Sequence, residues 1–152
     1  MNSPQLLKSV YIHGERASHL HGKAKSFFNL FWTIGIPWDI NPYDAVDNFA
    51  ELTNQDKKYI IIVSSAGALP AIEIARKYPE RIQKLVFFNP AISLNIFPRE
   101  HPITVYDSDD CFSRSAIPEN ITLLKLVGDH SFTWMDDMIN KIVEKEITEG
   151  YT

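Results

Sequence analysis

The sequence contains almost no cysteine. Cys111 is the single cysteine among 152 residues, so no internal disulfide can stabilise the fold. The chain must instead rely on a hydrophobic core, and its length suits one domain over residues 1–152. A cysteine-poor composition is typical of a reducing compartment, and we therefore expect a cytoplasmic protein. To act as a nucleophile, Cys111 would itself need an activating base.

Long apolar runs and an excess of basic residues are also missing. The apolar runs Ile60–Val63 and Leu85–Phe88 are too short to cross a bilayer, and Met1–Lys8 lacks the apolar core of a signal peptide. The 15 Lys and Arg residues face 19 Asp and Glu residues, for a net charge of -4. A nucleic-acid partner would favour a basic surface. We therefore expect neither nucleic acid nor a membrane as a partner, and the oligomeric state stays open.

Short β-branched runs alternate with longer segments of helical periodicity. Buried strands are predicted at Ser9–His13, Tyr59–Val63, Lys84–Phe88, Pro102–Tyr106 and Ile121–Val127, with a weak edge strand at Ile36–Ile40. Helices are predicted at Gly22–Ile34, at Asp44–Leu52 with Asp44 as N-cap, at Gly67–Tyr78 and from about Thr133 to Glu146. This alternation predicts an α/β fold, a three-layer sandwich with a mostly parallel central sheet.

A serine lies between a predicted buried strand and a predicted helix. Ser65 follows the strand Tyr59–Val63, and a sharp turn there would push its Oγ out above the sheet. The backbone N–H groups that follow would point into the same space at the positive end of a helix. Acyl transfer needs an exposed nucleophile and donors for the oxyanion. A helix-capping hydroxyl explains the same pattern, so both interpretations stay open.

The turn matches only part of the G-x-S-x-G pattern of nucleophile elbows. The sequence at this place is Val63-Ser64-Ser65-Ala66-Gly67, which has the second glycine and lacks the first. A small first residue normally relieves crowding at such a turn. We therefore expect Val63 to make the turn tighter or to change its angle slightly.

Aspartates and a histidine follow two later strands. Asp107, Asp109 and Asp110 come after the predicted strand Pro102–Tyr106. His130 comes after the next predicted strand, Ile121–Val127. The order of serine, acid and histidine, each just past a strand, is the one that a catalytic triad on such a sheet requires. The carboxyl ends of parallel strands meet at one edge, so these side chains are expected to come together there.

Four segments carry a resemblance to a known family: Tyr11–Gly14, Ser64–Ala68, Val86–Ala91 and Gly128–Thr133. On these residues the chain resembles the α/β-hydrolase superfamily, and within it the small bacterial esterases of the YqiA type. The resemblance implies a minimal α/β-hydrolase fold and a serine hydrolase, of esterase or thioesterase type, that acts on a small-molecule ester without a cofactor. Too few residues separate Ala91 from the acidic turn for a large lid.

The resemblance also assigns roles to individual residues. Ser65 matches the nucleophile, His130 the general base, and Asp109 the acid that orients the histidine. The acidic turn of the family aligns with this chain only to within one residue, so Asp110 stays an alternative, and Asp107 is a further candidate.

Two backbone donors for the oxyanion are implied by the same resemblance. The first is the N–H of Ala66, directly after the serine, and the second is the N–H of Glu15, with Arg16 as an alternative. Both donors would face the carbonyl oxygen of an ester attacked by the serine.

Other functions stay open at this point. Val63 is compatible with a catalytically inactive relative that acts as a binding or regulatory module. The helix start after Ser64 could bind a phosphate in a flavodoxin-like domain, although the G-x-G-x-x-G pattern and the P-loop lysine are missing. His13, His19 and His21 have no cysteine or carboxylate partners at ligand spacing, so we expect no metal site.

Overall fold

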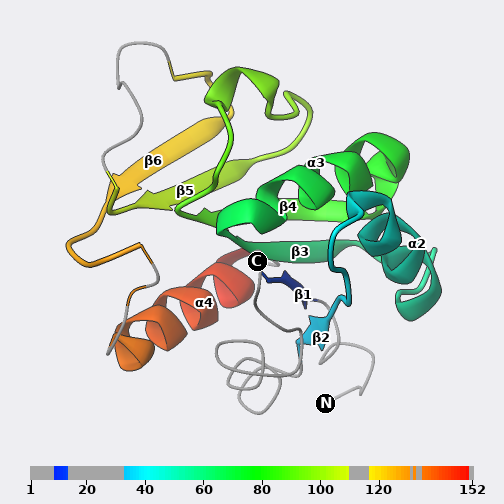
Figure 1. The fold of residues 1–152 in the computed structure, drawn as a ribbon, viewed down its shortest axis with the longest axis horizontal. Coiled ribbons are helices and arrows are strands. Elements are labelled where there is room, and N and C mark those ends of the chain that lie inside the picture. The colour runs from blue at the N-terminus through cyan, green and yellow to red at the C-terminus, as the bar shows by residue number, and fades with distance from the viewer. Residues whose placement is uncertain (1–8, 14–32, 110–116, 131, 133–134, 151–152) are drawn as a thin grey trace.

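The computed structural model describes residues 9–13, 33–109, 117–130, 132 and 135–150 (Figure 1). Its strands are β1 (Ser9–Ile12), β2 (Ile34–Gly35), β3 (Tyr59–Ser64), β4 (Ile82–Phe88), β5 (Ile103–Asp107) and β6 (Ile121–Lys125). Its helices are α2 (Pro42–Leu52), α3 (Ala68–Lys77) and α4 (Asp136–Gly150), with short 3-10 helices η2 (Ser65–Gly67), η3 (Pro79–Arg81) and η4 (Leu94–Ile96).

The six strands form one parallel sheet in the order β2-β1-β3-β4-β5-β6. The chain passes from β1 to β2 on one side and then crosses to β3 on the other, so the strand order reverses at β1 and β3. Ligands of open α/β sheets bind outside the carboxyl ends of the strands at such a switch point. Ser65 directly follows β3 and therefore lies at this place.

Helices cover both faces of the sheet. Figure 1 shows α2 and α3 on one side of the strands and α4 on the other. On β3, Ile61 and Val63 pack in the core beneath α2 and α3, whereas Ile60 and Ile62 pack in the core beneath α4, and all four are fully buried. A β-branched run buried on both faces is typical of a central parallel strand. The predicted three-layer α/β fold is confirmed.

One helix start differs from the prediction. The N-cap of α2 is Asn41, whose side chain accepts a hydrogen bond of 2.9 Å from the Tyr43 N–H. The predicted cap Asp44 was wrong, because it lies inside the first turn. Asparagine is a strong N-cap, and Pro42 at the first helical position has no N–H that needs a partner.

The short second strand also differs from the prediction. Ile34 and Gly35 pair with β1, and the Ile36 N–H donates to the Tyr11 carbonyl at 3.0 Å. The predicted helix end at Ile34 and the edge strand Ile36–Ile40 were therefore wrong. Pro37 has no N–H and cannot continue the pairing, so the strand ends before it. Thr33 is not helical either, and residues 22–32 of that predicted helix lie outside the described residues.

The connection from β4 to β5 is short. Residues 89–102 are all described, and their only helix is η4. No lid is inserted in this connection, in agreement with the expectation for this segment. The carboxyl edge of the sheet is therefore bordered here by a few residues of irregular chain.

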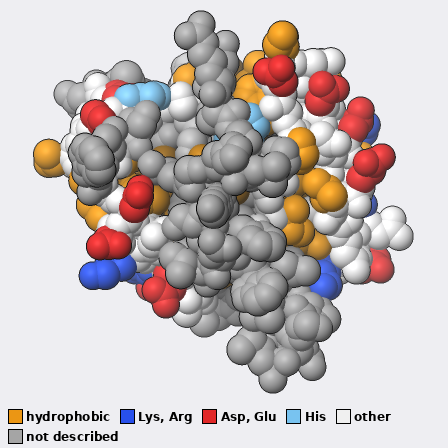
Figure 2. Space-filling model, turned by 60° about the horizontal axis from the view of Figure 1, so that its bottom comes forward, with side chains coloured by type: hydrophobic (Ala, Val, Ile, Leu, Met, Phe, Trp, Pro, Cys, Tyr) orange, Lys and Arg blue, Asp and Glu red, His pale blue; other side chains and the backbone are white. Residues whose placement is uncertain are grey.

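On the face in Figure 2, Asp and Glu side chains predominate at both sides of the view, with fewer Lys and Arg side chains beside them. A helix with the length and apolarity needed to span a bilayer does not occur in the described part of the chain. The cytoplasmic location stays a prediction.

Candidate active site

Ser65 has a left-handed backbone conformation with a φ of 49°. The preceding residue, Ser64, is still extended, with a φ of -119° and a ψ of 132°, so the chain turns sharply at Ser65 itself. This conformation costs a residue other than glycine about 1–3 kcal/mol, and the surrounding packing must impose it. Such strain at a polar residue, at the switch point of the sheet, is typical of functional sites.

The turn packs tightly against the end of β1 through Gly67. A Cβ at this position would lie 2.6 Å from the His13 carbonyl oxygen and 2.7 Å from that of Ile12. Only glycine therefore permits this approach without a backbone shift. Val63, where the elbow pattern has its first glycine, is fully buried within β3 and lies in register with Ile12 and Phe87.

The Ser65 hydroxyl contacts a histidine from the loop after β6. Its Oγ lies 2.7 Å from Nε2 of His130, and the side chain of His130 is half-exposed. The two residues are 65 positions apart in the sequence, and the parallel sheet brings them to the same edge. A hydroxyl at this distance from an imidazole nitrogen can give up its proton to the ring.

Asp109 lies on the other side of the same imidazole. Its Oδ2 contacts Nδ1 of His130, and its backbone N–H donates to Oδ1 of Asp107 at 3.0 Å. A carboxylate that accepts the Nδ1 proton leaves Nε2 with its lone pair toward the hydroxyl. The Ser65–His130–Asp109 cluster thus has the geometry of a serine, its base and an orienting acid.

The other two candidate acids are Asp107 and Asp110, and within the described residues the structure shows neither in contact with His130. Asp107 is fully buried at the end of β5, and its Oδ2 forms an ion pair of 2.6 Å with Lys125 on β6. Its carboxylate is therefore engaged with the sheet, and the imidazole of His130 is contacted by Asp109. Asp110 lies outside the described residues.

Ser65 is not the N-cap of either helical segment that follows β3. The N-cap of η2 is Ser64 and that of α3 is Gly67, and neither makes a side-chain cap hydrogen bond. The Ser64 Oγ instead accepts a hydrogen bond of 2.9 Å from the Tyr11 hydroxyl. Burial raises the pKa of Tyr11, which keeps this hydroxyl protonated as a donor.

The predicted oxyanion donors lie partly within the described residues. Ala66 follows Ser65 in η2 and is half-buried, with its backbone at the start of a helical segment that continues into α3. N–H groups at a helix start have no partner within the helix and favour negative charge. Glu15 and Arg16 lie outside the described residues, so the second donor stays a prediction.

Sequence reasoning missed one residue that borders the cluster. Asn89, directly after β4, is buried with a φ of 47°, and its side chain bonds to the backbone of His130 and to Ser108. An Asn-Pro pair directly after a buried strand, at the edge that carries Ser65, is the signal that could have found it.

Of the three histidines considered as metal ligands, only His13 lies within the described residues. The described part of the chain has no group of three or more His, Cys, Asp or Glu residues arranged to hold a metal ion. The His13 ring stacks on Trp38 with ring centres 5.6 Å apart, and its carbonyl accepts from the Trp38 indole N–H at 3.0 Å. His19 and His21 lie outside the described residues.

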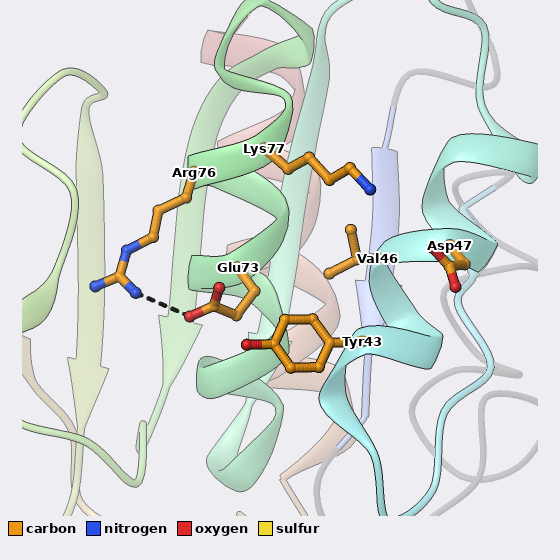
Figure 3. Close-up of a pocket in the computed structure, with 6 residues that line it drawn as sticks. All are labelled: Tyr43, Val46, Asp47, Glu73, Arg76 and Lys77. Carbon is orange, nitrogen blue, oxygen red and sulfur yellow. Dashed lines mark hydrogen bonds and ion pairs between the residues drawn. The ribbon is translucent and has the colours of Figure 1, made fainter.

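A hollow of about 280 Å³ lies between α2 and α3 (Figure 3). Its lining residues are Tyr43, Val46, Asp47, Glu73, Arg76 and Lys77. Arg76 forms an ion pair of 2.9 Å with Glu73, and the other two charged groups, Asp47 and Lys77, are also of opposite sign. None of the lining residues belongs to the Ser65–His130–Asp109 cluster, so the hollow is separate from it.

No protein-family model and no curated protein matches the sequence. Solved structures are nevertheless similar in fold over nearly the whole chain. Est1E from Butyrivibrio proteoclasticus has a TM-score of 0.67 at 13% identity, with 95% of this chain and 88% of that one covered. A protein described as a YdeN-like hydrolase, from Pectobacterium atrosepticum, has a TM-score of 0.67 at 18% identity, with 93% and 91% covered.

An extracellular α/β-hydrolase from a Paenibacillus species is similar as well. Its TM-score is 0.62 at 14% identity, with 91% of this chain and 98% of that one covered. The narrower resemblance to esterases of the YqiA type stays a prediction. Together with the six-stranded parallel sheet and its flanking helices, these similarities show that the chain has the α/β-hydrolase fold.

Proposed function

We propose that the protein is a serine hydrolase that cleaves small carboxylic esters or thioesters through an acyl-enzyme intermediate. The observation that carries the proposal is the Ser65–His130–Asp109 cluster. A serine hydroxyl on a strained turn lies 2.7 Å from an imidazole whose other nitrogen contacts a carboxylate. A serine, a histidine and an acid in these relative positions are the parts of a catalytic triad.

The proposed reaction has two steps. In the first, Nε2 of His130 takes the proton from Ser65 as Oγ attacks the carbonyl carbon, and the ring then returns that proton to the leaving alcohol or thiol. In the second, His130 takes a proton from water, the hydroxide attacks the acyl-serine, and the proton returns to Oγ as the acid leaves. Asp109 keeps the imidazole in the required tautomer and stabilises its charged form.

Negative charge builds up on the carbonyl oxygen in both steps. We assign its stabilisation to the backbone N–H of Ala66 and to a second N–H after β1, from Glu15 or Arg16. Removing one such donor typically lowers kcat by about 10²–10³-fold, so these groups would supply a large part of the rate enhancement.

Two observations favour a small ester as the substrate. The connection over residues 89–102 has no lid insertion, which would leave a small or open site. Solved structures of the same fold include Est1E and a complex of Est1E with ferulic acid. Esters of short acids and of aromatic acids are therefore the first substrates to test, and the proposed partner is a small molecule.

The test uses two neighbouring serines as a matched pair. We expect a fluorophosphonate probe to label the wild type and Ser64→Ala, and to leave Ser65→Ala unlabelled. Hydrolysis of p-nitrophenyl acetate should fall by about 10⁴–10⁶-fold in Ser65→Ala. Ser64 is the control because its Oγ is bonded to Tyr11.

The outcomes separate the proposed hydrolase from its alternatives. A folded wild type that the probe does not label would favour the binding or regulatory module that Val63 left open. Equal labelling of Ser65→Ala would assign the nucleophile to another residue. A matched pair of acetyl ester and acetyl thioester, compared by kcat/KM, then tells the two substrate classes apart.

A further inference from the structure

The turn after β4 makes hydrogen bonds to all three chain segments that hold the cluster. The Ala91 N–H donates to the Ser65 carbonyl at 3.0 Å. The Asn89 side chain accepts at Oδ1 from the Ser108 N–H at 2.7 Å and donates from Nδ2 to the His130 carbonyl at 2.8 Å. One three-residue turn therefore touches the segments of the serine, the acid and the histidine.

Asn89 is held firmly in this place. Its side chain is buried, its φ is 47°, and its own N–H donates to the Tyr106 carbonyl at 2.9 Å. Asparagine is among the few residues that tolerate a left-handed backbone, and its amide offers both donors and an acceptor. The position uses each of these properties, because Oδ1 accepts one hydrogen bond while Nδ2 donates two.

Ser108 extends the connection to the residue before the histidine. Its Oγ accepts from Asn89 Nδ2 at 2.9 Å and donates to the Asp129 carbonyl at 3.0 Å. Two successive carbonyls of the histidine loop, those of Asp129 and His130, are thus each bound by one of these two side chains. Asp109 follows Ser108 directly, so the same contacts set the acid and the imidazole relative to each other.

We propose that Asn89 is a positioning residue for the reaction at Ser65, and that its amide fixes the loop of Asp109 and the loop of His130 in one geometry. This inference rests on the proposed function, because it concerns the rate at which Ser65 is acylated. Asn89 takes no part in proton transfer. It acts through the backbone of His130 and through Ser108.

A loss of this amide should lower turnover more than substrate binding. The proton moves between Ser65 Oγ and His130 Nε2, and misplacement of a reacting group by about 1 Å can reduce the rate by about 10²-fold. Asn89 and Ser108 donate to backbone carbonyls of the histidine loop, and neither side chain is assigned a contact with the substrate. The expected signature is therefore a fall in kcat with KM unchanged.

The test pairs Asn89→Gly with Asn120→Ala. Glycine adopts the required φ without strain, so Asn89→Gly removes the amide and little else. Asn120 precedes β6 at the opposite edge of the sheet, and its Nδ2 also donates to two groups, the carbonyls of Pro98 and His101, each at 2.8 Å. Both variants lose partly buried amide hydrogen bonds, and only Asn89→Gly loses them beside the cluster.

We expect Asn89→Gly to lower kcat for p-nitrophenyl acetate and the rate of fluorophosphonate labelling by about 10–100-fold. Asn120→Ala should keep both rates even if its Tm falls as much as that of Asn89→Gly. In proton NMR, the downfield signal of the His130 Nδ1 proton should be present in the wild type and in Asn120→Ala, and shifted or broadened in Asn89→Gly.

Two further variants cover the case in which Asn89→Gly does not fold. Asn89→Asp keeps an acceptor for the Ser108 N–H and places a carboxylate oxygen against the His130 carbonyl, so its kcat should fall at least as far. Ser108→Ala removes the hydroxyl that accepts from Asn89 and donates to the Asp129 carbonyl, and it should lower kcat by a few-fold, about 3–10.

The possible failures are distinguishable. Suppose that the probe labels the wild type and that Asn89→Gly keeps the wild-type kcat and labelling rate. The positioning role is then overturned while the hydrolase proposal stands. Ser108→Ala is read in the same way if Asn89→Gly does not fold. An equal loss of kcat in Asn120→Ala would reduce the effect to general stability and overturn it too. A wild type without labelling or hydrolysis overturns the proposed function and this inference together.

Discussion

At the carboxyl edge of the sheet, the strained residues Ser65 and Asn89 both form side-chain hydrogen bonds to His130, whereas the amino edge leaves some of its buried polar groups without a partner. The described residues other than glycine that have a positive φ are Ser65, Asn89 and Phe132, and each follows the carboxyl end of a strand. At the amino edge, the buried atoms Nη1 of Arg81 and Nε2 of His101 have no hydrogen-bond partner.

The difference shows where the fold places its unfavourable backbone conformations. Left-handed residues cost free energy, and at the carboxyl edge they place a hydroxyl next to an imidazole and an amide between two loops. At the amino edge, Asn120 joins two turns through its amide, which serves packing. The following predictions change one edge at a time, and they start with the largest effect.

Two histidines provide the sharpest contrast between the edges. We expect His130→Ala to lower hydrolysis of p-nitrophenyl acetate by about 10⁴–10⁶-fold with little change in Tm, because the ring is half-exposed. His101→Ala, before β5, should lower the Tm and keep kcat/KM. Steady-state kinetics and thermal melts of both variants check this, and a large kcat loss in His101→Ala would contradict the separation of roles.

A buried ion pair joins β5 to β6 beside the cluster. Asp107 is fully buried, whereas the side chain of its partner Lys125 is 27% exposed. Lys125→Met leaves a buried carboxylate without its cation and should reduce the free energy of unfolding by about 3–5 kcal/mol. Asp107→Asn should reduce it less, since the freed ammonium can turn to solvent and an oxygen remains for the Asp109 N–H. Urea denaturation measures both, and the reverse order would count against this interpretation.

Gly67 tests how closely the serine turn must approach β1. Gly67→Ala puts a Cβ within 2.7 Å of two backbone carbonyl oxygens, and backbone cannot move aside as a side-chain end can. We expect a loss of about 1–3 kcal/mol in the free energy of unfolding together with slower fluorophosphonate labelling. Leu69→Ala, on the exposed side of α3, is the control for a substitution in the same segment. Wild-type stability and labelling in Gly67→Ala would show that the turn has more room than the structure indicates.

Much of the fold and of the cluster could be predicted because local patterns fix them. The β-branched run at Tyr59–Val63 identifies a strand buried on both faces, and the residue after it must emerge at the carboxyl edge. The same reasoning places His130 there after β6. Parallel pairing then brings both side chains together, although they are far apart in the sequence.

The remaining features depend on hydrogen bonds between distant segments, which no local pattern records. β5 extends to Asp107, one residue past its predicted end, and this extension directs the Asp107 carboxylate to Lys125 while Asp109 lies in the turn beyond. A shift of one residue thus separates a structural acid from the one beside His130. The role of Asn89 likewise depends on Ser108 and on the His130 carbonyl, 19 and 41 positions away in the sequence.

The smallest expected effect is the pH dependence that His101 gives to the amino edge. Burial lowers the pKa of His101 below its usual 6.5. The charge of Glu100 partly offsets this effect, and that of Lys58 adds a smaller lowering. As the pH falls through about 6.5, the unfolded chain binds a proton that the folded chain still excludes, so stability decreases on acidification. We expect the wild type to lose slightly more Tm than His101→Phe between pH 7 and pH 5, by about 2 °C. Both proteins keep His130, so the difference between their Tm values isolates the effect of His101. If Tm changes equally with pH in both proteins, the burial of His101 does not couple protonation to stability.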